Sequence, residues 1–61
     1  MEITRKNRQT GTTIILRNDD FLGWVTICEN HGGWAEHPSR KIATSWMAEP
    51  KVWCSGCQDH N

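Results

Sequence analysis

The 61-residue chain carries seven Lys and Arg against seven Asp and Glu, so its formal net charge is zero with neutral histidines. A chain this short forms one domain at most, and domains of this size usually need disulfides or a metal for stability. Zero net charge disfavours non-specific nucleic-acid binding, which depends on neutralising phosphates.

The cysteine count indicates a reduced compartment. Three cysteines cannot all pair in a disulfide framework, and the N-terminus has no apolar stretch typical of a secretory signal. No apolar run approaches the ~20 residues that a membrane-spanning helix requires. We therefore expect a cytoplasmic protein without membrane association, in which the cysteines bind a metal.

Charge is unevenly distributed along the chain. Residues 1–17 hold four Lys and Arg against one Glu, whereas residues 18–37 hold four acidic residues and no Lys or Arg. Residues 1–11 are polar and end at Gly11. Because chain ends are usually poorly ordered, we expect a weakly ordered N-terminal arm over residues 1–11 and a domain over residues 12–61.

Two β-strands are predicted after the arm. Residues 12–17 are rich in β-branched side chains, and residues 21–28 form a second such segment. Residues 18–20, Asn-Asp-Asp, are typical of a turn, so the two strands should form an antiparallel hairpin. Residues 34–37 are a candidate for a short third strand.

A short helix is predicted to follow Pro38. Ser39 is a suitable N-cap, and Ile42, Ala43, Trp46 and Met47 form one apolar stripe at helical spacing. The helix should end before Pro50, because the residue preceding proline disfavours the α region. Residues 51–53 are expected to be extended, and the fold class is therefore small α+β.

Two short-spaced pairs suggest one metal site. Cys28-x-x-His31 and Cys54-x-x-Cys57 together supply three sulfurs and one imidazole nitrogen, and glycines lie beside both pairs. This is a Cys3His set, which binds Zn²⁺ in a closed structural tetrahedron. Glycine permits the sharp turns that such knuckles require.

Other ligand sets remain open. His60 lies three residues after Cys57 and could replace His31, and His37 is a further alternative; the pairing with Cys28 and the following glycines favour His31. Cys54-x-x-Cys57 alone also fits a redox dithiol, although that motif normally begins a helix. Iron–sulfur ligation usually requires four thiolates.

Four tryptophans are many for this length, and three lie close to the predicted knuckles. Large aromatic rings can cover a metal site in a domain that is too small for a layered core. Exposed tryptophans can instead bind a partner. Candidate partner-binding residues are Trp34, Trp53, Arg40 and Lys41.

The chain resembles small zinc-ribbon-like proteins of bacteria and phages that carry a Trp-x-x-x-Cys-x-x-His-Gly … Pro-x-x-Trp-Cys-x-x-Cys pattern. The matching residues are Trp24, Cys28, His31, Gly32, Pro50, Trp53, Cys54 and Cys57. The resemblance implies a zinc-stabilised mini-domain with an N-terminal β-hairpin. The predicted helix between the knuckles departs from the usual zinc ribbon.

Two functions are consistent with this pattern. The first is a non-enzymatic structural-zinc module that binds another protein or acts as a small regulator. The second is a nucleic-acid-binding zinc domain, a transcription accessory that contacts phosphates through its basic arm and stacks bases on Trp34. No catalytic constellation is apparent, and a chain this small offers little room for a substrate pocket.

Overall fold

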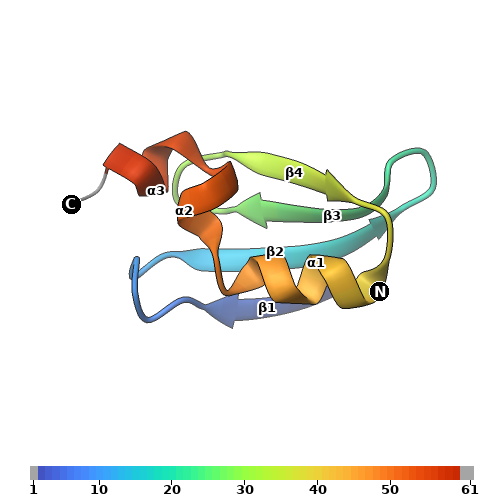
Figure 1. Ribbon diagram of the computed structural model, residues 1–61, viewed down its shortest axis with the longest axis horizontal. Coiled ribbons are helices and arrows are strands. Elements are labelled where there is room, and N and C mark those ends of the chain that lie inside the picture. The colour runs from blue at the N-terminus through green and yellow to red at the C-terminus, as the bar shows by residue number, and fades with distance from the viewer. Residues whose placement is uncertain (1, 60–61) are drawn as a thin grey trace.

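The computed structural model describes residues 2–59, which form a four-stranded antiparallel sheet and three short helices. The strands are β1 (Glu2–Lys6), β2 (Thr13–Asp19), β3 (Gly23–Cys28) and β4 (Trp34–His37), and the helices are α1 (Arg40–Met47), α2 (Pro50–Trp53) and α3 (Ser55–Asp59). The strands lie in the sheet in chain order. Helix α1 packs against β2, β3 and β4, and Figure 1 shows α2 and α3 gathered at one end of the sheet. The predicted small α+β class is confirmed.

The predicted hairpin is formed by β2 and β3, in which Ile15 pairs with Ile27. Its turn is stabilised by Asp19, whose Oδ1 accepts hydrogen bonds from the N–H groups of Phe21 and Leu22 at 2.8 and 3.0 Å. These two bonds also lower the pKa of the Asp19 carboxyl. Residues 34–37 form β4 beside β3, so the predicted third strand is confirmed as well.

The N-terminal segment differs from the expected arm. Residues 2–6 form the edge strand β1, which pairs with β2 in the register Ile3 to Leu16. The turn after β1 is stabilised by Asn7, whose Oδ1 accepts from the N–H groups of Gln9 and Thr10 at 3.0 and 3.1 Å. The sheet therefore begins before residue 12, because the strand-forming residues of β2 accept a further partner at their free edge.

Helix α1 is formed as the sequence predicts. The Oγ of Ser39 accepts a hydrogen bond from the N–H of Ile42 at 3.3 Å, which is an N-cap. Within the predicted stripe Ala43 and Met47 are buried, whereas Ile42 is exposed. The side of α1 that faces the sheet is therefore centred on Ala43 and Met47, and Ile42 lies at its edge.

Residues 50–59 differ from the prediction. Residues 51–53 are helical in α2. Pro50 occupies the first turn of this helix, where the missing N–H of proline costs no intrahelical hydrogen bond. The second cysteine pair enters a further short helix, α3. Between His31 and Cys54 the structure therefore has the expected strand β4 followed by two short helices, α1 and α2, where a single helix was expected.

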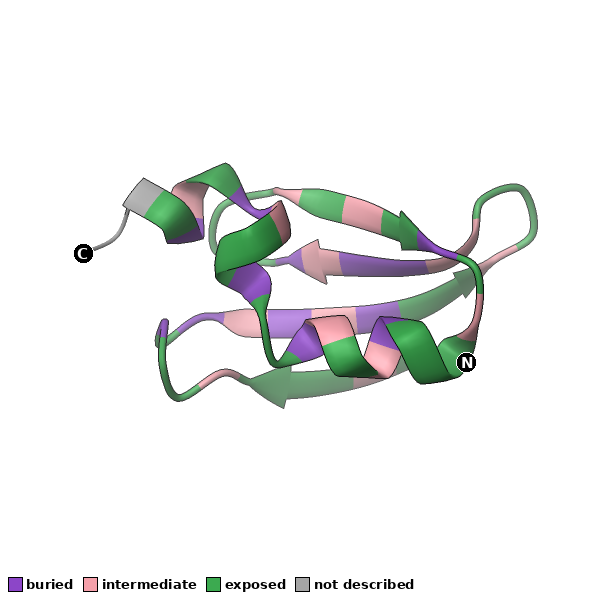
Figure 2. Ribbon diagram, viewed as in Figure 1, coloured by how far each residue is buried: buried purple, intermediate pink, exposed green. Residues whose placement is uncertain are grey.

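The two faces of the sheet are unequal. Ile14, Leu16, Thr26 and Cys28 are buried on one face. Ile14, Leu16 and Cys28 belong to a hydrophobic core that also includes residues of α1 and of the C-terminal cysteine pair. Figure 2 shows the buried segments of the sheet concentrated in its two central strands, β2 and β3. Within residues 2–59 no helix covers the opposite face, and no helix there is long and apolar enough to cross a membrane.

Candidate metal centre

Four ligand atoms converge at the end of the sheet where the helices α2 and α3 lie. The Sγ atoms of Cys28, Cys54 and Cys57 and a ring nitrogen of His31 all lie within 4.8 Å of one another. The Nδ1 of His31 is 3.3, 3.8 and 3.4 Å from these three sulfurs in that order. The Cys28 and Cys57 sulfurs are 3.6 Å apart.

These separations match a tetrahedron around one metal ion. Zn–S bonds near 2.3 Å and Zn–N bonds near 2.0 Å place tetrahedral ligand atoms about 3.8 Å apart for two sulfurs and about 3.5 Å apart for sulfur and nitrogen. Four of the six spacings, at 3.3 to 3.8 Å, lie close to these values, and all six lie within 4.8 Å. The four residues can therefore surround one metal ion.

The first pair is positioned by the end of β3. The N–H of Cys28 donates to the carbonyl of Gly33, and the N–H of Gly32 donates to the carbonyl of Cys28, both at 2.7 Å. Gly32 has a φ of +74°, a conformation that glycine adopts readily. This tight turn brings His31 back over the sulfur of Cys28.

The second pair is positioned by the short helices. Pro50 is buried, and its carbonyl accepts from the N–H of Cys54 at 2.8 Å. The Cys54 carbonyl in turn accepts from the N–H of Gln58 at 3.1 Å. The chain therefore passes through Cys54 from α2 into α3, and both sulfurs point toward the first pair.

Two glycines let the halves of the centre approach each other. A Cβ at Gly33 would lie 2.8 Å from the Cys54 sulfur, and a Cβ at Gly56 would overlap the His31 side chain. Each glycine lies on one half of the centre and faces a ligand of the other half. The glycine at each position is therefore required by packing between the two pairs rather than by backbone conformation.

The pKa values of the Cys54 and Cys57 thiols shift in opposite directions. Burial raises the pKa of the Cys57 thiol to about 11. Burial acts in the same direction on Cys54, but hydrogen bonds, led by the backbone N–H of Cys57, lower its pKa overall. A bound cation reverses the effect of burial, because thiols that coordinate a metal lose their protons.

A threonine pair supports the centre from the turn between β1 and β2. The Thr12 Oγ1 lies 3.6 Å from the Cys57 sulfur and 2.6 Å from the Thr10 Oγ1. The Thr10 hydroxyl donates to the Oδ1 of Asn7 at 3.3 Å. Sequence analysis missed this contact, and only the two threonines near the start of β2 could have suggested it.

The alternative histidines differ in placement. His37 lies at the end of β4, where its Nε2 is 2.8 Å from the Thr26 Oγ1. Its ring stacks on that of Trp46, with 6.5 Å between the ring centroids. Burial lowers the pKa of His37. His60 lies outside the described residues. Of the histidines described, His31 is the one that meets the three cysteines.

The predicted partner-binding residues fall into two groups. Trp53 packs against the core, and its indole N–H donates to the Trp46 carbonyl at 2.9 Å, which assigns it a structural role. Trp34 is 54% exposed on the uncovered face of the sheet. Arg40 and Lys41 are exposed at the start of α1.

Comparisons with protein-family models, with curated proteins and with solved structures return no significant match.

Proposed function

We propose that Cys28, His31, Cys54 and Cys57 bind one structural Zn²⁺ in a zinc-ribbon-like domain. Support comes from the donor set, since three thiolates and one imidazole suit Zn²⁺. Four protein ligands fill a tetrahedron and leave no position for water or substrate, as expected of a structural site. The proposed domain is therefore not an enzyme, and its thiolate ligands suit the reducing cytoplasm.

Metal analysis tests this assignment. Protein purified without added metal should contain one zinc per chain by inductively coupled plasma mass spectrometry. Co²⁺ substitution should give the absorption of a tetrahedral site with thiolate ligands. Cys57→Ser should lower the bound zinc, whereas Ser55→Ala, an exposed neighbour, should retain one equivalent. Iron in place of zinc, or zinc retained in full by Cys57→Ser, would contradict the proposal.

We further propose that the domain binds another protein through the uncovered face of its sheet. The observation that carries this proposal is an apolar row, Ile15, Ile27 and Trp34, in which each residue pairs with the next across β2, β3 and β4. Trp34 is the most exposed member and lies at the sheet edge. Exposed tryptophan is enriched in the energetic centres of protein interfaces.

The experiment compares two exposed aromatic residues. Phe21 is 96% exposed in the turn between β2 and β3, away from the apolar row, and serves as the matched control. A partner captured from extract of the source organism by wild-type and Phe21→Ala protein should be lost with Trp34→Ala. The purified partner should then bind Trp34→Ala at least tenfold more weakly, a loss of about 1.4 kcal/mol. Equal partner binding by Trp34→Ala and Phe21→Ala would show that the apolar row is not part of the interface.

In the nucleic-acid alternative, the basic N-terminal residues contact phosphates while Trp34 stacks on bases. The register places Arg5 in line with Ile14, on the face that the helices cover. Trp34 aligns with Ile27 and Ile15 on the opposite face. We therefore treat the basic residues as a separate surface.

A further inference from the structure

We propose that a basic cleft between β1 and α1 binds the phosphodiester backbone of a nucleic acid. The cleft has a volume of about 280 Å³. Its lining residues are Arg5, Lys6, Asn7, Arg8, Thr44, Met47 and Ala48. Three of these are cations, and none of the seven is acidic. This surface lies apart from both the metal centre and the apolar row.

The cations of the cleft are available to a ligand. Arg17 pairs with Glu2 at 2.9 Å, on the face of the sheet opposite Arg5. Arg5, Lys6 and Arg8 are exposed, and no acidic side chain neutralises them there. Arginine suits phosphate because its planar group offers several donors in a fixed fork.

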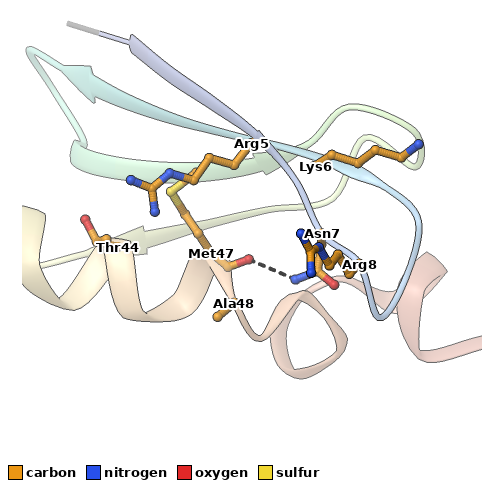
Figure 3. Close-up of a pocket in the computed structure, with 7 residues that line it drawn as sticks. All are labelled: Arg5, Lys6, Asn7, Arg8, Thr44, Met47 and Ala48. Carbon is orange, nitrogen blue, oxygen red and sulfur yellow. Dashed lines mark hydrogen bonds between the residues drawn. The ribbon is translucent and has the colours of Figure 1, made fainter.

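The cleft has a fixed frame beneath these cations. Figure 3 shows Arg5 extending from β1 toward Thr44 of α1, with Arg8 beside Asn7 at the other end and the Lys6 ammonium pointing away from the helix. The Nδ2 of Asn7 donates to the Met47 carbonyl at 3.3 Å, which joins the two walls. This bond also satisfies a carbonyl at the C-terminal end of α1, an end that would otherwise disfavour an anion.

The shape of the cleft favours a polymer over a small molecule. Most lining residues are exposed, and Met47 is the buried one. Small ligands are usually enclosed over most of their surface, which an open trough of this volume cannot do. A nucleic-acid backbone brings repeated charges, so several weak contacts add without enclosure. The lining contains no aromatic residue, so we expect binding to be independent of base sequence.

The experiment measures binding of a labelled 20-nucleotide oligo(dT) and oligo(rU) by fluorescence anisotropy as salt is raised. Two phosphate contacts, from Arg5 and Arg8, predict a slope of about −1.4 in log K against log salt, at about −0.7 per contact for single strands. Arg5→Gln and Arg8→Gln should each weaken binding about fivefold to tenfold at 50 mM salt and reduce the slope by about 0.7. DNA and RNA should bind alike.

Arg17→Gln is the matched control, because it removes one positive charge from the other face of the sheet. Its binding should stay within twofold of wild type, and circular dichroism should confirm that each variant is folded. Equal losses in Arg5→Gln and Arg17→Gln would overturn the proposal. So would a flat salt titration, or binding of a phosphoserine peptide or phosphatidylglycerol vesicles in preference to both oligonucleotides. None of these outcomes depends on the apolar row.

Discussion

At the scale of single residues, Gly56 is a position where the candidate metal centre leaves no room for a side chain. Gly56→Ala would place a methyl group against the His31 side chain and force the two halves of the centre apart. We expect a loss of about 1–3 kcal/mol in the free energy of unfolding, as for other overpacked sites, together with weaker metal binding. Thermal unfolding and zinc competition with a chromogenic chelator measure both. The neighbouring variant Ser55→Ala, on an exposed residue, should change neither; equal behaviour of the two variants would show that the close approach is unimportant.

Thr12 is the second residue whose effect should reach the metal. Thr12→Val keeps the shape of the side chain but removes the hydroxyl that lies 3.6 Å from the Cys57 sulfur and bonds to Thr10. Loss of such outer contacts typically costs 10- to 100-fold in metal affinity. Chelator competition should detect this change. Thr13→Val is the control, because the contacts of Thr13 come from its backbone, whose N–H donates to Asn30 and whose carbonyl accepts from the N–H of Glu29. An unchanged affinity in Thr12→Val would refute the role of the hydroxyl.

At the scale of secondary structure, the cap of α1 can be tested alone. Ser39→Ala removes the oxygen that accepts from the Ile42 N–H and should destabilise the domain by about 1 kcal/mol. Ser45 lies within the same helix and is exposed, so Ser45→Ala is the control and should be neutral or slightly stabilising. Chemical unfolding of both variants with the metal bound gives the comparison. A destabilisation by Ser45→Ala as large as that by Ser39→Ala would argue against capping.

His37 connects β4 to β3 and to α1 and makes the fold sensitive to pH. Burial lowers the pKa of His37 below its ordinary value near 6.5, so the folded state binds fewer protons than the unfolded state just below that pH. The contribution of neutral His37 to the free energy of unfolding is therefore fully present above about pH 6.5, and it is lost as the pH falls through the folded-state pKa. An NMR titration of the His37 ring should give a pKa below 6.5, and a value at or above it would refute this account.

The elements differ in how well the sequence predicted them. The hairpin of β2 and β3 and the helix α1 follow from β-branched runs, turn residues and a capping serine, all of which act locally. Strand β1 could not be predicted in this way, because its polar residues form a strand only against the free edge of β2. Residues 51–53 were expected to be extended, yet they turn into α2, since Pro50 suits the first turn of a helix as well as it ends the preceding one.

The candidate site shows the same division. The short spacing pointed to all four candidate ligands, because two side chains with two residues between them can meet in one turn. The sequence favoured His31 through its pairing with Cys28 and the glycines that follow it. Its meeting with Cys54 and Cys57 depends on the chain returning through β4 and α1, which is a property of the tertiary fold. The contact from Thr12 and the close approach at Gly56 have no sequence signature, because each joins parts of the chain more than twenty residues apart.

At the scale of the whole molecule, the candidate metal centre forms part of the hydrophobic core. The core cluster contains Ile14, Leu16, Cys28, Ala43, Met47, Cys54 and Cys57, so three of its seven residues are ligands of the proposed metal. The remaining four apolar side chains are few for a domain of this size, which is already marginal. Without a cation, the core would have to keep three thiols buried around a histidine.

Removal of the metal should therefore unfold the domain rather than leave an empty site. Binding free energy in small zinc domains is largely folding free energy, so the two should be lost together. Excess EDTA should abolish the β-sheet signal in circular dichroism and collapse the dispersion of the amide NMR spectrum, and added Zn²⁺ should restore both. EDTA already saturated with Zn²⁺ is the control and should have no effect. A chelated protein that kept a dispersed spectrum would show that Ile14, Leu16, Ala43 and Met47 suffice as a core, and that the proposed zinc has a role other than folding.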